Sequence, residues 1–253
     1  MFKKIRFIRK AFILGCLFSL SSSNLIAQEE GSQERKWAIS LNISPDVAFR
    51  HLSSDVTSND NIIDFRNGYE SPMICYTGLV GIEYHPLPRL AIRSGINYSV
   101  RGEVIDFEIW IPPTTEFDNS LPTTKVRNEY HSFGIPLLVS YDIIHKTNIN
   151  LFITGGVGLN YLYKRYSRVQ SDQLDSPFQL ENSSSIPAND DFTDFNLFNP
   201  SAILSLGVDF KLGGRSALRI EPIFRHSLLP LANAPIKEYQ FSGGLNIGYL
   251  FSL

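Results

Sequence analysis

Apolar and polar residues alternate with a period of two in eight segments of this chain. In the clearest segment, 151–163, every second residue from Leu151 is apolar or tyrosine, apart from a glycine, and the residues between are mostly small or polar. The other seven segments are 37–43, 80–84, 92–100, 133–141, 202–212, 218–224 and 239–251. Alternation of this length predicts β-strands, and no convincing 3.6-residue period marks a helix.

The connections between these segments are alternately long and short. The long, polar connections are 51–71, 111–125, 167–199 and 227–237. The short ones are 85–89, 145–147 and 213–215. Short periplasmic turns and longer extracellular loops are typical of a transmembrane β-barrel. The sequence therefore predicts an all-β protein, an eight-stranded antiparallel up-and-down transmembrane β-barrel over residues 37–253, in the cell outer membrane with both termini in the periplasm.

The two faces of each strand follow from this fold. The bulky stripe faces lipid, and the glycines and small polar residues point into a barrel just wide enough to be filled by side chains. Aromatic girdles are expected at both ends, with Tyr161, Tyr163 and Tyr166 on one side. The girdle on the periplasmic side would contain Trp37, Tyr84, Tyr141 and Tyr249.

A water-soluble β-sandwich or a lipocalin-like barrel would show the same alternation, because only the positions of core and solvent are exchanged. Two features favour the membrane barrel. A sandwich has no reason for a strict alternation of loop lengths. The polar stripe is also rich in glycine, where a face in water would favour Lys, Glu and Thr.

The start of the chain has the three parts of a secretory signal peptide. Residues 2–10 include five basic residues, 11–20 are apolar, and Ala27 offers a small residue for cleavage. The apolar part is too short for a bilayer, which takes ~20 residues. We expect a signal peptide over 1–27 and a short periplasmic segment over 28–36. Ile13 to Cys16 also resembles a lipobox, but the apolar run continues past the cysteine.

Removal of 1–27 changes the charge of the chain. It leaves 18 of the 23 basic residues and all 25 acidic residues, a net charge near −7. Proteins that bind nucleic acid carry a basic patch, so nucleic acid is not an expected partner. Cys75 is then the last cysteine and has no internal disulfide partner, and no Cys/His cluster has zinc spacing. We expect no metal and no cofactor.

Three segments of the sequence resemble a known family. GIPLLVSYDI (134–143), NLFITGGVGLNYL (150–162) and NPSAILSLGVDFKLG (199–213) are similar to the PorT-like outer-membrane β-barrel domain family of Bacteroidota. The resemblance covers essentially all of the mature chain and has no catalytic residue to carry over. It implies an outer-membrane location and, through PorT, a link to type IX secretion and gliding. The chain departs from the usual aromatic end of such barrels with Leu253.

Motifs for catalysis are absent from the sequence: it has no G-x-S-x-G, no H-E-x-x-H and no P-loop. The pairs His131–Ser132 and His226–Ser227 are the candidates for a rim enzyme. Adjacent residues of a strand point to opposite faces, so neither pair suits a nucleophile and its base unless the strand has ended. His226 lies near the outer end of its strand, so a distorted site stays open there. The sequence therefore predicts a protein without enzymatic activity.

Charged residues share the inward stripe with the glycines. They are Glu83, Arg93, Arg101, Asp209, Lys211, Arg219, Glu221 and Arg225. Buried charges must be paired. A three-residue turn, 213–215, sets Leu212 opposite Ser216 and hence Asp209 opposite Arg219. The same rule sets Gly81 opposite Arg93, with Glu83 diagonal to it. Such charges suit either a gated, ion-selective lumen or, as we favour, a structural plug of ion pairs in a closed barrel.

Three functions remain open at this level. The first is a structural or surface-interaction role through the long extracellular loops. The second is an accessory factor of a secretion or envelope-assembly machine, and the third is a small pore or a lipid-modifying rim enzyme. Expected partners are outer-membrane lipid and lipopolysaccharide, the barrel-assembly machinery during insertion, and an envelope protein of unknown identity.

Overall fold

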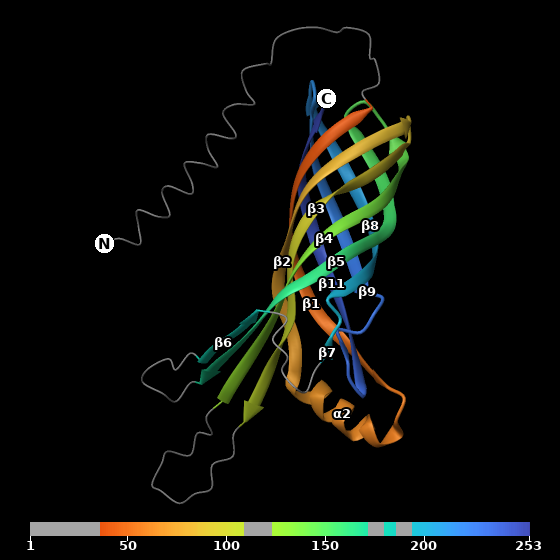
Figure 1. The fold of residues 1–253 in the computed structure, drawn as a ribbon. Coiled ribbons are helices and arrows are strands. Elements are labelled where there is room, and N and C mark those ends of the chain that lie inside the picture. The colour runs from red at the N-terminus through yellow and green to blue at the C-terminus, as the bar shows by residue number, and fades with distance from the viewer. Residues whose placement is uncertain (1–35, 109–122, 172–179, 186–193) are drawn as a thin grey trace, which may run out of the picture. The chain divides into compact units, whose positions relative to one another are not determined.

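The computed structural model describes residues 36–108, 123–171, 180–185 and 194–253 (Figure 1). The expected signal peptide, 1–27, and nearly all of the segment 28–36 lie outside the described residues, so both stay predictions. The strands are β1 Trp37–Ser54, β2 Glu70–Leu87, β3 Leu90–Glu108, β4 Thr123–His145, β5 Ile149–Ser171, β6 Leu180–Ser185, β7 Asp194–Phe195, β8 Phe198–Gly213, β9 Ser216–Ser227, β10 Ala232–Asn233 and β11 Ile236–Ser252.

Eight long strands form a closed ring. Their hydrogen-bonded order is β4-β3-β2-β1-β11-β9-β8-β5, and β4 also pairs with β5. All pairs are antiparallel, so the predicted eight-stranded up-and-down barrel is confirmed. Closure pairs the edge strands, which a sheet in lipid requires because unpaired backbone groups find no water there. The short strand β6 adds to β5, and β7 pairs with β10.

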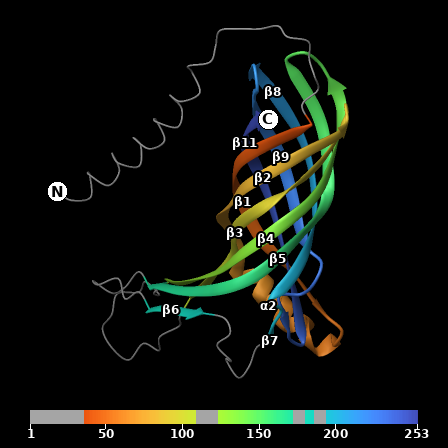
Figure 2. The ribbon, with the colours of Figure 1, turned by 45° about the horizontal axis from the view of Figure 1, so that its top comes forward.

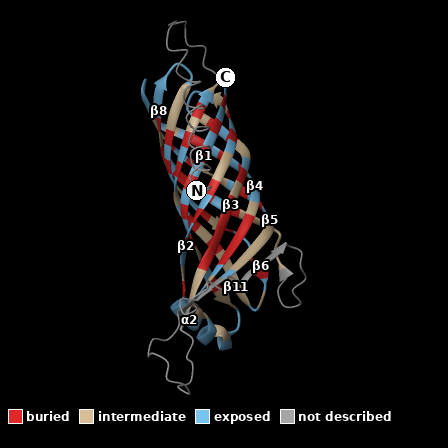
Figure 3. Ribbon diagram, turned by 90° about the vertical axis from the view of Figure 1, so that its left-hand side faces the viewer, coloured by how far each residue is buried: buried red, intermediate tan, exposed pale blue. Residues whose placement is uncertain are grey.

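Burial alternates along the strands as the sequence pattern predicts. In β1, exposed and buried residues alternate without a break from Trp37 to Ala48, and Phe49 is partly exposed. Figure 3 shows the same alternation of buried and exposed residues on other strands. The exposed members are large apolar residues such as Leu41, at 62%, and Ile74, at 76%. Such exposure is unfavourable in water, whereas lipid chains solvate this face.

The barrel has two different ends. At one end, which we call the turn end, the turns 88–89, 146–148 and 214–215 connect neighbouring strands, and the C-terminus lies there (Figure 1). At the other, the loop end, the strands run beyond the expected span of ~9–11 residues. The long strands contain 12 to 23 residues, with β4 and β5 the longest.

One connection contains a helix that the sequence analysis did not predict. Segment 51–71 was expected to be a polar loop, but it contains the 3-10 turn Thr57–Asn59 and the helix α2, Asp60–Tyr69. None of the residues of α2 is buried. A helix without a buried face needs no apolar stripe, so it leaves no 3.6-residue pattern to find. Across the described ranges, no helix is long and apolar enough to cross a membrane.

The turn after β8 is shorter than predicted, but the predicted pairing of Asp209 with Arg219 is confirmed. Gly213, not Leu212, lies opposite Ser216, and the register shifts between Lys211 and Gly213. Gly213 and Gly214 have φ of 100° and 59°, which glycine adopts without strain. The bulge at Leu212 compensates for the shorter turn, so Asp209 lies opposite Arg219 as predicted.

The predicted register of the β2–β3 hairpin was wrong by two residues. Gly81 lies opposite Gly95, and Glu83 lies directly opposite Arg93 instead of diagonal to it. The prediction placed a five-residue turn at 85–89. The strands instead pair as far as Leu87 and Leu90, which leaves a two-residue turn.

Aromatic residues gather at both ends of the lipid-facing surface. At the turn end, the rings of Trp37 and Tyr84 lie 4.6 Å apart. At the loop end, Tyr163 stacks on Phe133 with ring centroids 4.9 Å apart, and Tyr98 lies 5.5 Å from Phe133. Further along the same belt, Tyr161 contacts Phe198 at 5.2 Å, and Tyr166 meets the ring of His131 at 4.8 Å. We call this series the loop-end belt.

Gly207 is packed so tightly that we expect Gly207→Ala to destabilise the barrel by ~1–3 kcal/mol, as overpacking does. It lies opposite Phe152, whose side chain is 1% exposed inside the barrel. A Cβ at 207 would come within 2.2 Å of the ring. Urea unfolding in detergent would measure the loss.

Gly155→Ala is the matched control, because a Cβ at that position meets nothing within 4 Å. It should change the free energy of unfolding by no more than ~0.5 kcal/mol. Equal effects of the two substitutions would contradict the packing of Phe152 against Gly207.

Candidate functional site

Five charged residues fill the half of the barrel near the turns. This turn-half cluster consists of Glu83, Arg93, Asp209, Arg219 and Glu221, each no more than 8% exposed. Arg219 donates from Nε to Asp209 Oδ1 at 2.7 Å and from Nη2 to Asp209 Oδ2 at 2.8 Å. Its Nη1 and Nη2 also donate to the carboxylate of Glu83. Arg219 therefore joins two carboxylates, one beside it in the sheet and one across the lumen.

Arg93 completes the turn-half cluster from the opposite wall. It donates to both oxygens of Glu221, at 2.9 and 3.1 Å, and its Nε lies 3.3 Å from Glu83 Oε1. Glu221 also accepts hydrogen bonds from Ser205 and Asn246. Bidentate arginine–carboxylate pairs of this kind have fixed geometry and are stronger than neutral hydrogen bonds.

A single aromatic ring lies against both guanidinium groups of the turn-half cluster. The guanidinium carbons of Arg93 and Arg219 are 5.7 and 4.7 Å from the centroid of Phe152. A cation within about 6 Å of an aromatic face is attracted to it, and the attraction is stronger when both are desolvated. The ring fills space between the charges and leaves less room for water.

A second ion pair lies further from the turns. Arg225 Nη1 donates to both oxygens of Asp46, at 3.0 and 3.1 Å. Asp46 also accepts from Ser44 and Thr77, both at 2.6 Å. Asp46 lies outside the segment 37–43 that the alternation predicts as the first strand, whereas β1 continues through Pro45.

Beyond the loop-end belt lies a third group of charges, which we call the outer cluster. It contains Arg50, Arg66, Glu70, Glu103 and Glu238. Arg50 Nε is 2.6 Å from Glu70 Oε2, and Arg66 of α2 binds Glu70 and, at 3.1 Å, Glu238. These residues were missed because they lie outside the predicted strands. The helix that contributes Arg66 gave no pattern in the sequence.

Glu103 has an unusual titration in the outer cluster. Burial raises the pKa of Glu103 to about 8, and the nearby carboxylate of Glu238 adds to this effect. Asn128 Nδ2 donates to Glu103 Oε1 at 2.9 Å and opposes the rise. The charge of Glu70 raises the pKa of Glu103 slightly, and the charge of Arg66 lowers it slightly. The carboxyl group is therefore protonated in the folded barrel at pH values where it would be ionised in the unfolded chain.

We expect the free energy of unfolding to fall as the pH rises from the ordinary value of 4.5 to about 8. In that window the folded state binds more protons at Glu103 than the unfolded state, so stability is highest below it and is lost above it. Glu103→Gln should flatten this part of the profile, as urea titrations across the window would show. An unchanged slope would mean that Glu103 does not carry the effect.

Two of the predicted lumen charges are not in these clusters. Lys211 is exposed at the turn end and donates to the backbone carbonyl of Lys146 at 3.3 Å, so its place in a lumen network was wrong. It stands where the barrel meets water, two residues beyond Asp209, and its long side chain reaches solvent. Arg101 is buried, at 6% exposure, but forms no ion pair with any described residue.

The two His–Ser pairs do not form catalytic arrangements. His131 Nδ1 is 2.6 Å from the hydroxyl of Tyr98, whereas Ser132 Oγ is 2.8 Å from Ser99 Oγ. The ring of His226 lies near Phe224, at 6.5 Å, and Ser227 lines a separate interior cavity. In the described ranges, no group of three or more His, Cys, Asp or Glu residues is placed to hold a metal ion.

A closed ring of eight strands, with apolar residues outside and charges inside, defines an integral outer-membrane β-barrel. Residues 26–233 match the model of the outer membrane protein beta-barrel domain, and the chain belongs to that family. It is an outer-membrane protein. No curated protein sequence matches it.

Three solved structures are similar to this chain over most of its length. Neisserial surface protein A has 12% identity and a TM-score of 0.43, with coverage of 86% of this chain and 97% of that chain. OprG from Pseudomonas aeruginosa has 11% identity and a TM-score of 0.43, with coverage of 87% and 97%. Ail, the attachment invasion locus protein of Yersinia pestis, has 13% identity and a TM-score of 0.35, with coverage of 86% and 99%.

Proposed function

We propose that this protein is a closed, non-conducting and non-enzymatic barrel that acts through its loop end as a surface-interaction protein. The observation that carries the proposal is the contrast between its two parts. The lumen is occupied by paired charges at three levels, whereas the sheet continues well beyond the loop-end belt. A pore would need an open lumen, and a purely structural barrel would not need the additional sheet.

The paired charges support a closed lumen. The turn-half cluster, the Arg225–Asp46 pair and the outer cluster succeed one another from the turns to the loops. Apart from Glu103, which Asn128 and Tyr130 hydrogen-bond, the carboxylates of these groups pair with arginines, and side-chain hydroxyls and amides provide further hydrogen bonds. Side chains of this size fill an eight-stranded barrel, whose interior has little space beyond them.

The sheet beyond the belt supports an interaction role. It is formed by Glu103–Glu108 paired with Thr123–Asn128, of which Thr124–Asn128 pairs in turn with Ser167–Ser171. Strand β6 extends it at the side of β5. We call these strands the loop-end extension, and Figure 2 shows it bending away from the barrel. An ordered sheet presents side chains with less loss of conformational freedom on binding than a flexible loop would.

Exposed basic side chains on the loop-end extension suggest which partners it binds. The side chains of Lys125, Arg127 and Arg168 are 54%, 46% and 50% exposed, and each also lies within 4.0 Å of a carboxylate, Asp106 for the lysine and Glu129 for both arginines. They rise just above the loop-end belt, where lipopolysaccharide would place its phosphates. We include outer-membrane lipid and lipopolysaccharide among the proposed partners, together with the barrel-assembly machinery during insertion and an envelope protein. Arginine and lysine suit phosphate groups by charge and hydrogen bonding.

Photo-crosslinking in intact cells tests the interaction role. A photoreactive residue at Lys125, in the extension, should form adducts with lipopolysaccharide or with a protein. The control at Leu206, on the lipid-facing surface of β8, should form adducts with lipid alone. If Lys125 gives no adduct other than those at Leu206, the extension has no partner of its own.

Conductance in planar bilayers tests the closed lumen. The purified barrel should add no current above that of the bilayer, because the paired side chains of the turn-half cluster occupy the lumen. Steady ion currents from the unmodified protein would favour a pore and overturn the closed-barrel proposal.

A second proposal rests on the resemblance to the PorT-like family. The segments 134–143 of β4 and 150–162 of β5, which carry this resemblance, support a role as an accessory factor in secretion or envelope assembly. A deletion strain scored for type IX secretion and gliding distinguishes the two proposals. Loss of both activities would support the accessory role, and normal secretion and gliding would leave surface interaction as the better account.

A further inference from the structure

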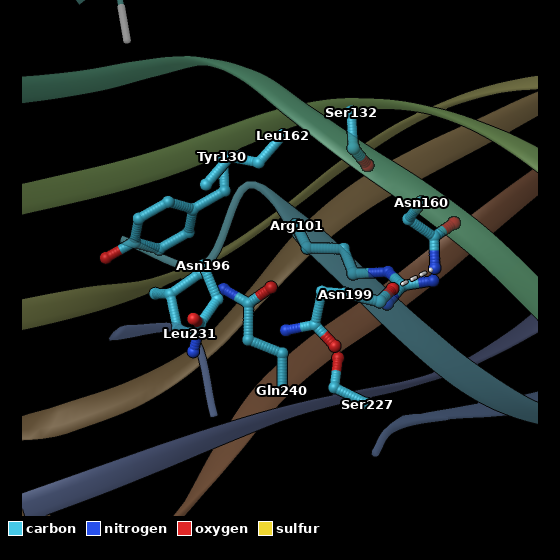
Figure 4. A pocket seen from close by; sticks show the side chains of 10 residues that line it. All are labelled: Arg101, Tyr130, Ser132, Asn160, Leu162, Asn196, Asn199, Ser227, Leu231 and Gln240. Atoms are coloured by element: carbon cyan, nitrogen blue, oxygen red, sulfur yellow. Dashed lines mark hydrogen bonds between the residues drawn. The ribbon is translucent and has the colours of Figure 1, made fainter. Parts of the chain in front are cut away.

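A small cavity lies inside the barrel near its loop end. Its volume is about 20 Å³, and residues of β3, β4, β5, β8, β9 and β11 line it (Figure 4). A cavity of this size holds one species not much larger than a water molecule. Its position is close to the loop-end belt, on the outer side of the Arg225–Asp46 pair.

Arg101 lines this cavity as an unpartnered cation. Its side chain is 6% exposed, and it makes no hydrogen bond or ion pair with a described residue. Its Nε is buried without any hydrogen-bond partner. A guanidinium group stays protonated in proteins, so Arg101 cannot relieve its burial by losing a proton.

Other polar groups around the cavity are also unpaired. Gln240 is 7% exposed, and its Nε2 has no hydrogen-bond partner. Ser227, 2% exposed, contributes a hydroxyl to the lining. Nearly all buried polar groups of folded proteins have a partner, so several orphans around one cavity indicate a bound species. Their donors outnumber the one unpaired acceptor in the lining, Asn199 Oδ1.

The neighbouring charges require an anion rather than a cation. Arg225 lies close enough to oppose the charge of Arg101, and it already binds both oxygens of Asp46. Asp46 is already bound by Arg225, and no carboxylate of the described ranges lies within 4 Å of the Arg101 guanidinium nitrogens. Two guanidinium groups thus share one carboxylate in this part of the lumen, which leaves one positive charge without a counter-ion.

We propose that the cavity binds a single small monovalent anion of the chloride class, held by Arg101, Gln240 and Ser227. The guanidinium repels cations, and the small volume favours a monatomic anion over a larger polyatomic one. The anion completes the charge balance of the middle of the barrel. It makes the stability of the closed lumen depend on chloride, which is a property separate from the surface-interaction role.

Apolar residues shield the anion from the outside. Tyr130, Leu162 and Leu231 are buried together, and Phe195 of β7 packs against them. Tyr130, Leu162 and Leu231 also line the cavity. The exclusion of bulk water by these residues strengthens the attraction between the guanidinium and a bound anion.

Urea unfolding of the whole mature protein in detergent tests the site. At constant ionic strength, replacement of sodium gluconate by sodium chloride should shift the urea midpoint upward and then saturate, as a ligand that binds only the folded state does. Bromide should act like chloride, because the two ions are close in size. Arg101→Gln should abolish the shift, and Arg127→Gln, outside the cavity, should keep it.

Gln240→Leu provides a second variant in case Arg101→Gln fails to fold. It keeps Arg101 and should weaken the chloride response, which moves the saturating concentration upward. A crystal grown in bromide should show one anomalous peak between Arg101 and Gln240. A midpoint that does not respond to chloride, or an equal response in Arg101→Gln and the unmodified protein, would overturn the proposal and leave a water molecule as the occupant.

Discussion

Arg219→Met is expected to lower the free energy of unfolding by about 3–5 kcal/mol, because it leaves buried carboxylates without their cation. Arg219 binds Asp209 beside it and Glu83 across the lumen, and all three are at least nine-tenths buried. Methionine keeps the length of the side chain and removes only the charge and the hydrogen bonds. Urea titration of the refolded barrel in liposomes, followed by tryptophan fluorescence, would measure the loss.

Lys211→Met is the matched control for Arg219→Met. Lys211 lies on the neighbouring strand but is exposed, and it binds only a backbone carbonyl. Its removal should change stability by no more than ~0.5 kcal/mol. Similar losses in both variants would show that the turn-half cluster is not buried in the folded protein.

Exchange of the two charges is not expected to rescue the barrel. The hairpin register alone suggests that Asp209→Arg combined with Arg219→Asp keeps the pair and recovers much of the loss. The structure changes this expectation, because Glu83 would then face a carboxylate in place of the guanidinium that it now binds. A double-mutant cycle would measure the coupling. Full recovery would contradict the contact between Glu83 and Arg219.

Leu206→Arg is expected to destabilise the barrel by about 2–4 kcal/mol, the cost of a charge at the middle of the bilayer. Leu206 is 49% exposed on the outer face of β8, between Phe198 at the loop end and the turn at 214–215. Unfolding in liposomes would measure the cost, because detergent does not reproduce the depth of a bilayer.

Leu212→Arg is the depth control for this substitution. Leu212 is 57% exposed on the same strand but lies beside the turn, where an arginine side chain reaches water. The cost there should be about 0–1 kcal/mol. A neutral Leu206→Arg, or equal costs at both positions, would mean that this face does not meet lipid.

Local patterns in the sequence were sufficient for the fold. Alternation shows which residues share a face, and loop lengths show which strands are joined by tight turns. Asp209 and Arg219 could be paired from the sequence because a short turn separates them by only ten positions. The register of β8 and β9 depends on the few residues of the turn between them. The predicted turn was one residue too long, and the bulge at Leu212 compensated for this difference.

The tertiary structure alone decided the contacts across the lumen and beyond the membrane. Glu83 and Arg219 are 136 residues apart in sequence, and Asp46 and Arg225 are 179 apart. Such pairs depend on how the closed ring staggers its strands and on how far each side chain reaches, and neither leaves a periodic signal. For the same reason, the sequence placed Arg101 in the lumen but could not show that Asp46 already binds Arg225.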